Sequence, residues 1–93
     1  MNRELIPTAA FNRAVRRYLR RNPKEFERIE TTLEALADDA FSPRLRTHKL
    51  KGNLAGTWAC SAGRDLRILF EFVNTDDGEA ILLLSVGNHD SVY

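Results

Sequence analysis

Hydrophobic positions divide the chain into a helical first half and a strand-rich second half. Between residues 8 and 21, apolar side chains recur every three to four positions: Phe11, Val15, Tyr18 and Leu19. This spacing predicts an amphipathic helix through about Arg21, preceded by Thr8, a residue type that caps the first turn of helices. The opposite side of the same helix is strongly basic.

A second amphipathic helix is predicted from the turn at Asn22–Pro23 to about Ala40. Its apolar stripe consists of Phe26, Ile29, Leu33 and Leu36. Asn22 is suited to cap this helix, Pro23 to its first position, and Glu25 completes a capping-box pattern. Because the turn is so short, the two helices are expected to form an antiparallel hairpin.

The second half of the chain alternates apolar runs with turn residues, which predicts strands. They are expected at Thr57–Ser61, Leu66–Val73 and Ala80–Val86, after a short N-terminal strand at Arg3–Ile6. The segment Asn74–Gly78 joins the last two as a hairpin, and the continuous apolar run Ala80–Val86 is typical of a central strand. The order predicts an α+β fold: a short strand, a helical hairpin, then a twisted antiparallel sheet with both helices on one face.

Composition favours one globular domain spanning residues 1–93. The chain is 43% hydrophobic and 29% charged, which is ordinary for folded proteins. No apolar run approaches the roughly 20 residues needed to cross a bilayer, and the first residues do not resemble a signal peptide. The single cysteine, Cys60, permits no internal disulfide. We therefore expect a cytoplasmic protein without a membrane partner.

Charge is distributed unevenly although the net charge is only +1. Residues 1–51 contain 12 basic and 7 acidic residues, a balance of +5, whereas residues 52–93 contain 2 and 6, a balance of −4. A basic half can form a surface that attracts phosphate groups, although a solvated helix surface has the same composition.

Residues capable of chemistry gather in three clusters, each at the start or end of a predicted strand. The clusters are Arg44, Arg46, His48, Lys49 and Lys51; Arg64, Asp65 and Arg67; and Asn88, His89, Asp90 and Tyr93. No metal-ligand spacing, phosphate-binding glycine loop or serine nucleophile motif is present, so neither a metal nor another cofactor is expected.

The residue types in these clusters suit cleavage of RNA without a metal. Histidine titrates near neutral pH and can act as acid or base, as His48 and His89 would. Arginine presents fixed donors to a phosphate, as Arg67 would, and an aromatic side chain such as Tyr93 can stack on a base.

The ordered segments of the second half resemble the RelE/ParE superfamily of toxins. They are His48–Gly52, Gly56–Cys60, Asp65–Phe70, Ser85–Asp90 and Val92–Tyr93, and the basic helical hairpin before them fits the same pattern. The sequence is most similar to the YafQ-like and RelE/StbE-type branches. The resemblance implies the toxin of a type II toxin–antitoxin system. It further implies a ribosome-dependent endoribonuclease that cuts messenger RNA by attack of a ribose 2′-hydroxyl and is neutralised by a cognate antitoxin.

The resemblance also assigns roles by position. Arg67 would stabilise the phosphate, His48 and His89 would share the acid and base roles, Asp65 would orient a histidine, and Tyr93 would stack on or orient the codon. Four basic residues are expected to bind RNA: Arg46, Lys49, Lys51 and Arg64.

Two positions depart from the YafQ-like pattern: Ser61 stands where that branch often has histidine, and Leu66 where it often has tryptophan. Two other functions remain open at this stage. One is a ParE-like inhibitor of DNA gyrase, and the other is an inactive relative that binds an antitoxin.

Overall fold

The computed structural model describes residues 2–63 and 65–88. The chain begins with strand β1 (Glu4–Pro7) and continues through helices α1 (Ala9–Arg21) and α2 (Phe26–Asp38). Four further strands follow: β2 (His48–Lys49), β3 (Trp58–Ser61), β4 (Leu66–Thr75) and β5 (Gly78–Asn88). The connections contain three 3₁₀ turns: η1 (Pro23–Glu25), η2 (Pro43–Leu45) and η3 (Gly52–Leu54).

The strands form one five-stranded sheet in the order β1-β5-β4-β3-β2. The α+β class and the order of elements are confirmed, and β5 is an interior strand as predicted. The sheet is not wholly antiparallel, however, because β1 pairs with β5 in parallel. The helical hairpin provides the crossover that such a parallel connection requires. Strand β2 was not predicted, since two residues are too few to show an alternating pattern.

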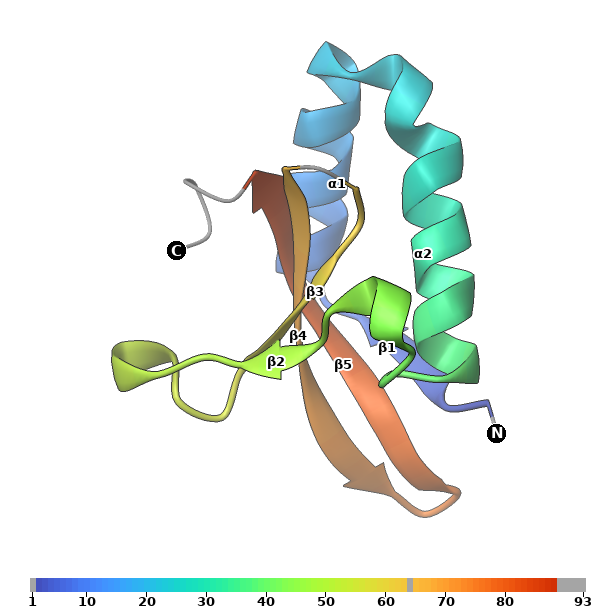
Figure 1. Ribbon diagram of the computed structural model, residues 1–93, viewed down its shortest axis with the longest axis vertical. Helices are drawn as coiled ribbons and strands as arrows, with labels where there is room; N and C mark the ends of the chain where they lie inside the picture. The colour runs from blue at the N-terminus through green and yellow to red at the C-terminus, as the bar shows by residue number, and fades with distance from the viewer. Residues whose placement is uncertain (1, 64, 89–93) are drawn as a thin grey trace.

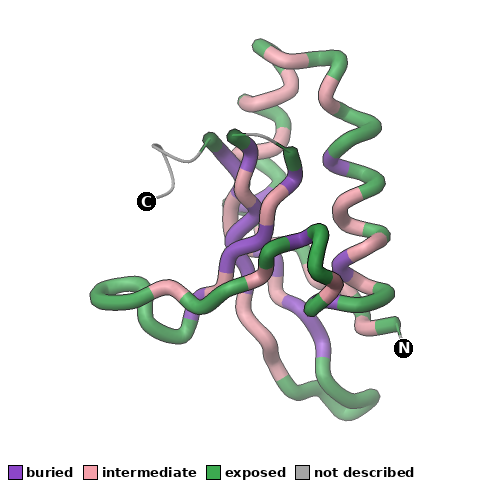
Figure 2. The backbone as a smooth tube through the Cα atoms, viewed as in Figure 1, coloured by how far each residue is buried: buried purple, intermediate pink, exposed green. Residues whose placement is uncertain are grey.

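Both helices pack on one face of the sheet, as Figure 1 shows. Leu66, Ile68 and Phe70 alternate along β4 and enter the core together with Phe11 of α1 and Leu36 of α2. Figure 2 shows buried residues along the strands but not at the tip of the β4–β5 hairpin, which is exposed, as is much of the helix surface. Side chains that alternate with the core residues point to the opposite side of the sheet, which we call the outer face.

Thr8 joins α1 to the sheet. Its hydroxyl accepts a hydrogen bond from the Phe11 N–H (3.0 Å), as predicted for a capping residue, and donates one to the Leu83 carbonyl of β5 (2.9 Å). The backbone N–H of Thr8 also donates to the Leu83 carbonyl. The start of α1 is therefore fixed directly to an interior strand.

The capping box predicted at the second helix was wrong. The Asn22 side-chain amide instead donates to the Tyr18 carbonyl (3.1 Å), so it satisfies the end of α1 rather than the start of α2. Glu25 forms an ion pair with Arg28 (3.0 Å). The chain makes the 3₁₀ turn Pro23–Glu25 first, so Glu25 lies before α2 and not in its first turn.

Two side chains of β3 contribute to the core side of the sheet. Cys60 is fully buried, and Trp58 packs against the core cluster from β3. In the residues that the structure describes, no helix has the length and apolar character required to cross a membrane.

Candidate functional site

Arg67 lies on the outer face near the end of the sheet. It precedes Ile68 on β4, and alternation turns it away from the core. It pairs with Ser61 of β3 on one side and with Gly87 of β5 on the other. Because Gly87 has no side chain, the space beside Arg67 over β5 is not filled from that position.

Two hydrogen bonds orient the Arg67 side chain, which is half-buried. Its Nη1 donates to the Ser61 hydroxyl (3.3 Å) and to the Leu66 carbonyl (3.1 Å). The Ser61 hydroxyl in turn donates to the Gly63 carbonyl (2.8 Å). These contacts connect the guanidinium to the turn between β3 and β4.

The sequence did not predict the contact between Ser61 and Arg67. Ala62 N–H donates to the Leu66 carbonyl, so Ala62 and Leu66 form a hydrogen-bonded pair that closes the turn. The next pair, Ser61 and Arg67, is then of the non-hydrogen-bonded kind, in which side chains approach most closely. Counting outward from a turn centred on Gly63 would pair Ser61 with Asp65, so the sequence did not reveal this register.

His48 lies on the same face, at the edge of the sheet. It pairs with Ala59 of β3, which in turn pairs with Leu69 of β4. Ala59 is two residues before Ser61, the partner of Arg67. Two strand spacings and two residues separate the Cα atoms of His48 and Arg67 by about 12 Å in a regular sheet. The His48 ring is exposed, and its Nδ1 lies 2.9 Å from the Arg46 carbonyl oxygen.

The predicted RNA-binding residues are not all on this side. Lys49 follows His48 and points to the opposite side of the sheet, where its Nζ lies 5.5 Å from the centre of the Trp58 ring. Phe41 and Phe72 pack against the same ring. Lys49 is therefore separated from Arg67 by the sheet itself. Arg46 and Lys51 are exposed on either side of β2, and Arg46 adopts a left-handed backbone conformation (φ 52°).

Asp65 is exposed directly before β4. Its charge acts on the helix side, where the pKa of the Tyr18 hydroxyl is raised, chiefly by burial and secondarily by Glu25, with a smaller contribution from Asp65. Asp65 therefore lies at the end of the sheet that α1 approaches.

Three predicted site residues lie outside the described residues: Arg64, His89 and Tyr93. The last described residue, Asn88, pairs with Leu66, so β5 ends beside the start of β4 and one residue pair from Arg67.

Two kinds of chemistry find no support among residues 2–63 and 65–88. These residues contain no group of three or more His, Cys, Asp or Glu side chains arranged to bind a metal ion. Burial raises the pKa of the Cys60 thiol to about 12, so at neutral pH it remains protonated and unsuited to nucleophilic attack.

Comparisons with solved structures identify the fold. YafQ from Escherichia coli strain BL21(DE3) is 11% identical, with 98% of each chain covered and a TM-score of 0.78. YafQ in the E. coli DinJ–YafQ toxin–antitoxin complex is 12% identical, with coverage of 100% of this chain and 99% of that chain and a TM-score of 0.76. A YoeB/ParE toxin from Agrobacterium tumefaciens is 16% identical, with coverage of 92% and 98% and a TM-score of 0.74.

At these identities the structural likeness shows the fold alone, and no curated protein sequence matches the chain. The family follows from the sequence. Residues 3–93 match the model of a family described as "Bacterial toxin of type II toxin-antitoxin system, YafQ". This match spans almost the whole chain, and it agrees with a fold in which a basic helical hairpin covers one face of the sheet and Arg67 lies on the other. The chain therefore belongs to the YafQ family of bacterial toxins from type II toxin–antitoxin systems.

Proposed function

We propose that the protein is a metal-independent endoribonuclease that cuts messenger RNA on the ribosome. The observation that supports this most directly is Arg67, which lies on the outer face with its guanidinium oriented by Ser61 and the Leu66 carbonyl. A fixed guanidinium can stabilise the negative charge that develops on a phosphate during cleavage. The residues 1–93 would act as one toxin domain.

The proposed reaction is an internal transfer. A ribose 2′-oxygen attacks the neighbouring phosphorus as its proton passes to a base, the bond to the 5′-oxygen breaks, and an acid protonates that oxygen. The products are a 2′,3′-cyclic phosphate and a 5′-hydroxyl. We assign the acid and base roles to His48 and His89, an orienting role to Asp65, and contact with the base to Tyr93. Arg46, Lys51 and Arg64 would bind the RNA backbone.

The distance between His48 and Arg67 bears on ribosome dependence. Side chains whose Cα atoms are about 12 Å apart can contact one substrate only if that substrate is positioned accurately between them. A ribosome that fixes the codon would supply this positioning, and it would place the toxin in the cytoplasm. Lys49 lies on the other face, so we propose that it contacts RNA or an antitoxin there rather than the reacting phosphate.

A cognate antitoxin is the second proposed partner. The solved E. coli YafQ complex contains its antitoxin DinJ, and this chain has the same fold over its whole length. Arg17 and Arg21 of α1 are exposed and provide positive charge that would attract an acidic antitoxin segment.

Cleavage of a defined messenger RNA on translating ribosomes, mapped by primer extension, tests the enzymatic proposal. Arg67→Ala should reduce the cleavage rate by about 10²- to 10³-fold, because it removes a preorganised donor to the phosphate. Arg13→Ala, which removes an exposed arginine of α1, serves as the matched control and should cut at nearly the wild-type rate. His89→Ala should also lose most of its activity.

Absence of codon-phased cuts with folded wild-type protein would contradict the proposal. Inhibition of supercoiling by DNA gyrase would then identify a ParE-like inhibitor. An antitoxin-binding protein without either activity would indicate an inactive relative.

A further inference from the structure

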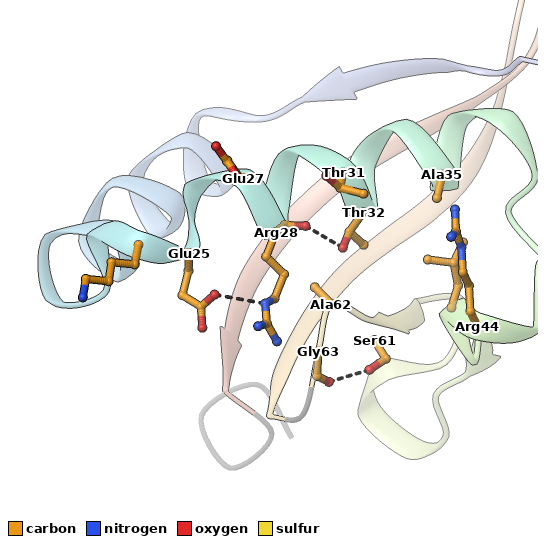
Figure 3. A pocket seen from close by; sticks show the side chains of 12 residues that line it. Glu25, Glu27, Arg28, Thr31, Thr32, Ala35, Arg44, Ser61, Ala62 and Gly63 are labelled. Atoms are coloured by element: carbon orange, nitrogen blue, oxygen red, sulfur yellow. Dashed lines mark hydrogen bonds and ion pairs between the residues drawn. The ribbon is translucent and has the colours of Figure 1, made fainter.

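A second basic site lies where α2 passes the end of β3. A crevice of about 530 Å³ is lined there by α2, by η2 and by the turn between β3 and β4. Its cationic side chains come from three elements: Lys24 of η1, Arg28 of α2 and Arg44 of η2. Figure 3 shows Arg28 directed from α2 toward Gly63, with Arg44 on the other side of Ser61 in this view.

Gly63 makes room for the Arg28 side chain. A β-carbon at Gly63 would lie 2.9 Å from Arg28 Cδ and still closer to its Nη1, and the Gly63 φ of +124° disfavours other residues. The Nε of Arg28 pairs with Glu25 (3.0 Å), which orients the rest of the guanidinium over the turn. The absence of a side chain at Gly63 and an ion pair with Glu25 therefore orient this exposed arginine along the crevice.

The edge of β3 adds backbone donors to the same place. The pairing of β2 with β3 ends at His48 and Ala59, so Ser61 lies beyond His48, the first residue of β2. Ala62 N–H donates to the Leu66 carbonyl of β4 (2.8 Å), and successive backbone N–H groups of a strand point to opposite sides. The Ser61 N–H consequently points away from β4, toward the side that the crevice occupies.

Ser61 also links the crevice to Arg67. Ser61 lines the crevice, and its hydroxyl contacts Arg67 on the outer face and the Gly63 carbonyl in the turn. Three arginines (Arg28, Arg44 and Arg67) thus surround one short turn. The carboxylates Glu25 and Glu27 also line the crevice, and Glu25 is already paired with Arg28. Cations outnumber carboxylates by three to two, which favours an anion.

We propose that the crevice binds a phosphodiester of the same RNA strand whose reacting phosphate lies at Arg67. Guanidinium groups and an outward-pointing backbone N–H are the donors that phosphate oxygens prefer. The strand would pass around the end of β3, with Ser61 between the two phosphates. This inference rests on the proposed function and adds a second contact point for its substrate.

Binding measurements separate this site from catalysis. The probe is a short oligoribonucleotide with 2′-O-methyl groups throughout, which the full-length protein cannot cut, and the dissociation constant is measured over a range of salt concentrations. The double variant Arg28→Gln/Arg44→Gln should bind at least about tenfold more weakly, and its logarithmic salt dependence should fall by about one phosphate contact. The control Arg13→Gln/Arg20→Gln changes net charge equally on the exposed side of α1 and should lose much less affinity.

A third variant, Arg28→Lys/Arg44→Lys, keeps the charge and should recover part of the affinity at an unchanged salt dependence. Equal losses in the crevice and control variants would overturn the proposal. So would binding of inorganic phosphate that the double variant loses while its RNA binding is unchanged, because the crevice would then hold only an adventitious free anion. If the crevice variant loses RNA binding but the wild type cuts no messenger RNA, the ribonuclease proposal fails and the crevice remains an RNA-binding site.

Discussion

Ser61 pairs with Arg67 between β3 and β4, and Cys60 belongs to the next residue pair, yet the two pairs lie on opposite faces of the sheet. Ser61 and Arg67 point to the outer face, whereas Cys60 and its partner Ile68 are fully buried in the core. The one-residue alternation of a strand is sufficient to separate a polar site from an inert thiol. Whether a side chain of β3 can reach Arg67 on the outer face therefore depends on its position in the strand alternation, and not on how near it is in sequence.

The buried Cys60 thiol should make stability depend on pH in alkaline solution. Burial raises its pKa from 9.0 to about 12, with a smaller opposing effect from Arg67. Above pH 9 the unfolded chain loses this proton while the folded chain retains it, so the free energy of unfolding decreases as pH rises toward 12. The decrease between pH 8 and pH 10 should be about 1–2 kcal/mol.

Urea unfolding of the wild type and of Cys60→Ala at pH 8, 9 and 10 measures this effect. The variant lacks the thiol but keeps every other titrating group, including Tyr18, so the difference between the two profiles isolates Cys60. Parallel profiles would show that the thiol ionises equally well in the folded protein.

At the scale of elements, the joint between α1 and β5 is the feature most open to test. Thr8 both caps α1 and donates to the Leu83 carbonyl, so one hydroxyl serves a helix and an interior strand. Thr8→Ala removes both hydrogen bonds and should lower the free energy of unfolding by about 1–2 kcal/mol. Thr8→Ser retains the hydroxyl, so it should lower the free energy of unfolding by only a few tenths of the amount lost in Thr8→Ala.

Chemical denaturation at neutral pH measures both Thr8 variants. If Thr8→Ala and Thr8→Ser are equally stable, the hydroxyl contributes nothing and the methyl group accounts for any loss. A change in the slope of the transition, as opposed to its midpoint, would instead indicate a change in the unfolded state.

Sequence patterns predicted both helices and four of the five strands, and missed the two-residue strand β2. The apolar stripes of α1 and α2 and the runs in β4 and β5 are long enough to show their periods, and those elements are present. Strand β2 has two residues and no period of its own; only its partner β3 defines it. Asn22 was assigned to the wrong helix because one residue between two helices can satisfy either end, and the backbone geometry of the turn decides which.

At the scale of the whole molecule, the candidate site was predicted only in part. The sequence pattern was sufficient to place Arg67 outside the core, since Leu66 and Ile68 are apolar on either side of it. It could not show that Lys49 lies on the Trp58 side, because the face that β2 presents depends on its pairing with β3. Nor could the sequence pattern predict the contact between Arg28 and Gly63. These residues are 35 positions apart in sequence, and they meet only because α2 packs on the sheet edge.

The same packing predicts that the helices and the sheet unfold together. The core cluster combines Phe11 and Leu36 from the helices with Phe70 and Ile81 from the sheet, so neither layer has a separate core among the described residues. Trp58 is the single tryptophan and reports on β3, whereas far-ultraviolet circular dichroism reports mainly on α1 and α2. For one cooperative domain, the tryptophan fluorescence and circular dichroism transitions in urea should coincide in midpoint and slope. A helical signal that persists after the Trp58 signal is lost would show that the hairpin is a separate folding unit. The domain would then comprise two parts rather than the one that its shared core predicts.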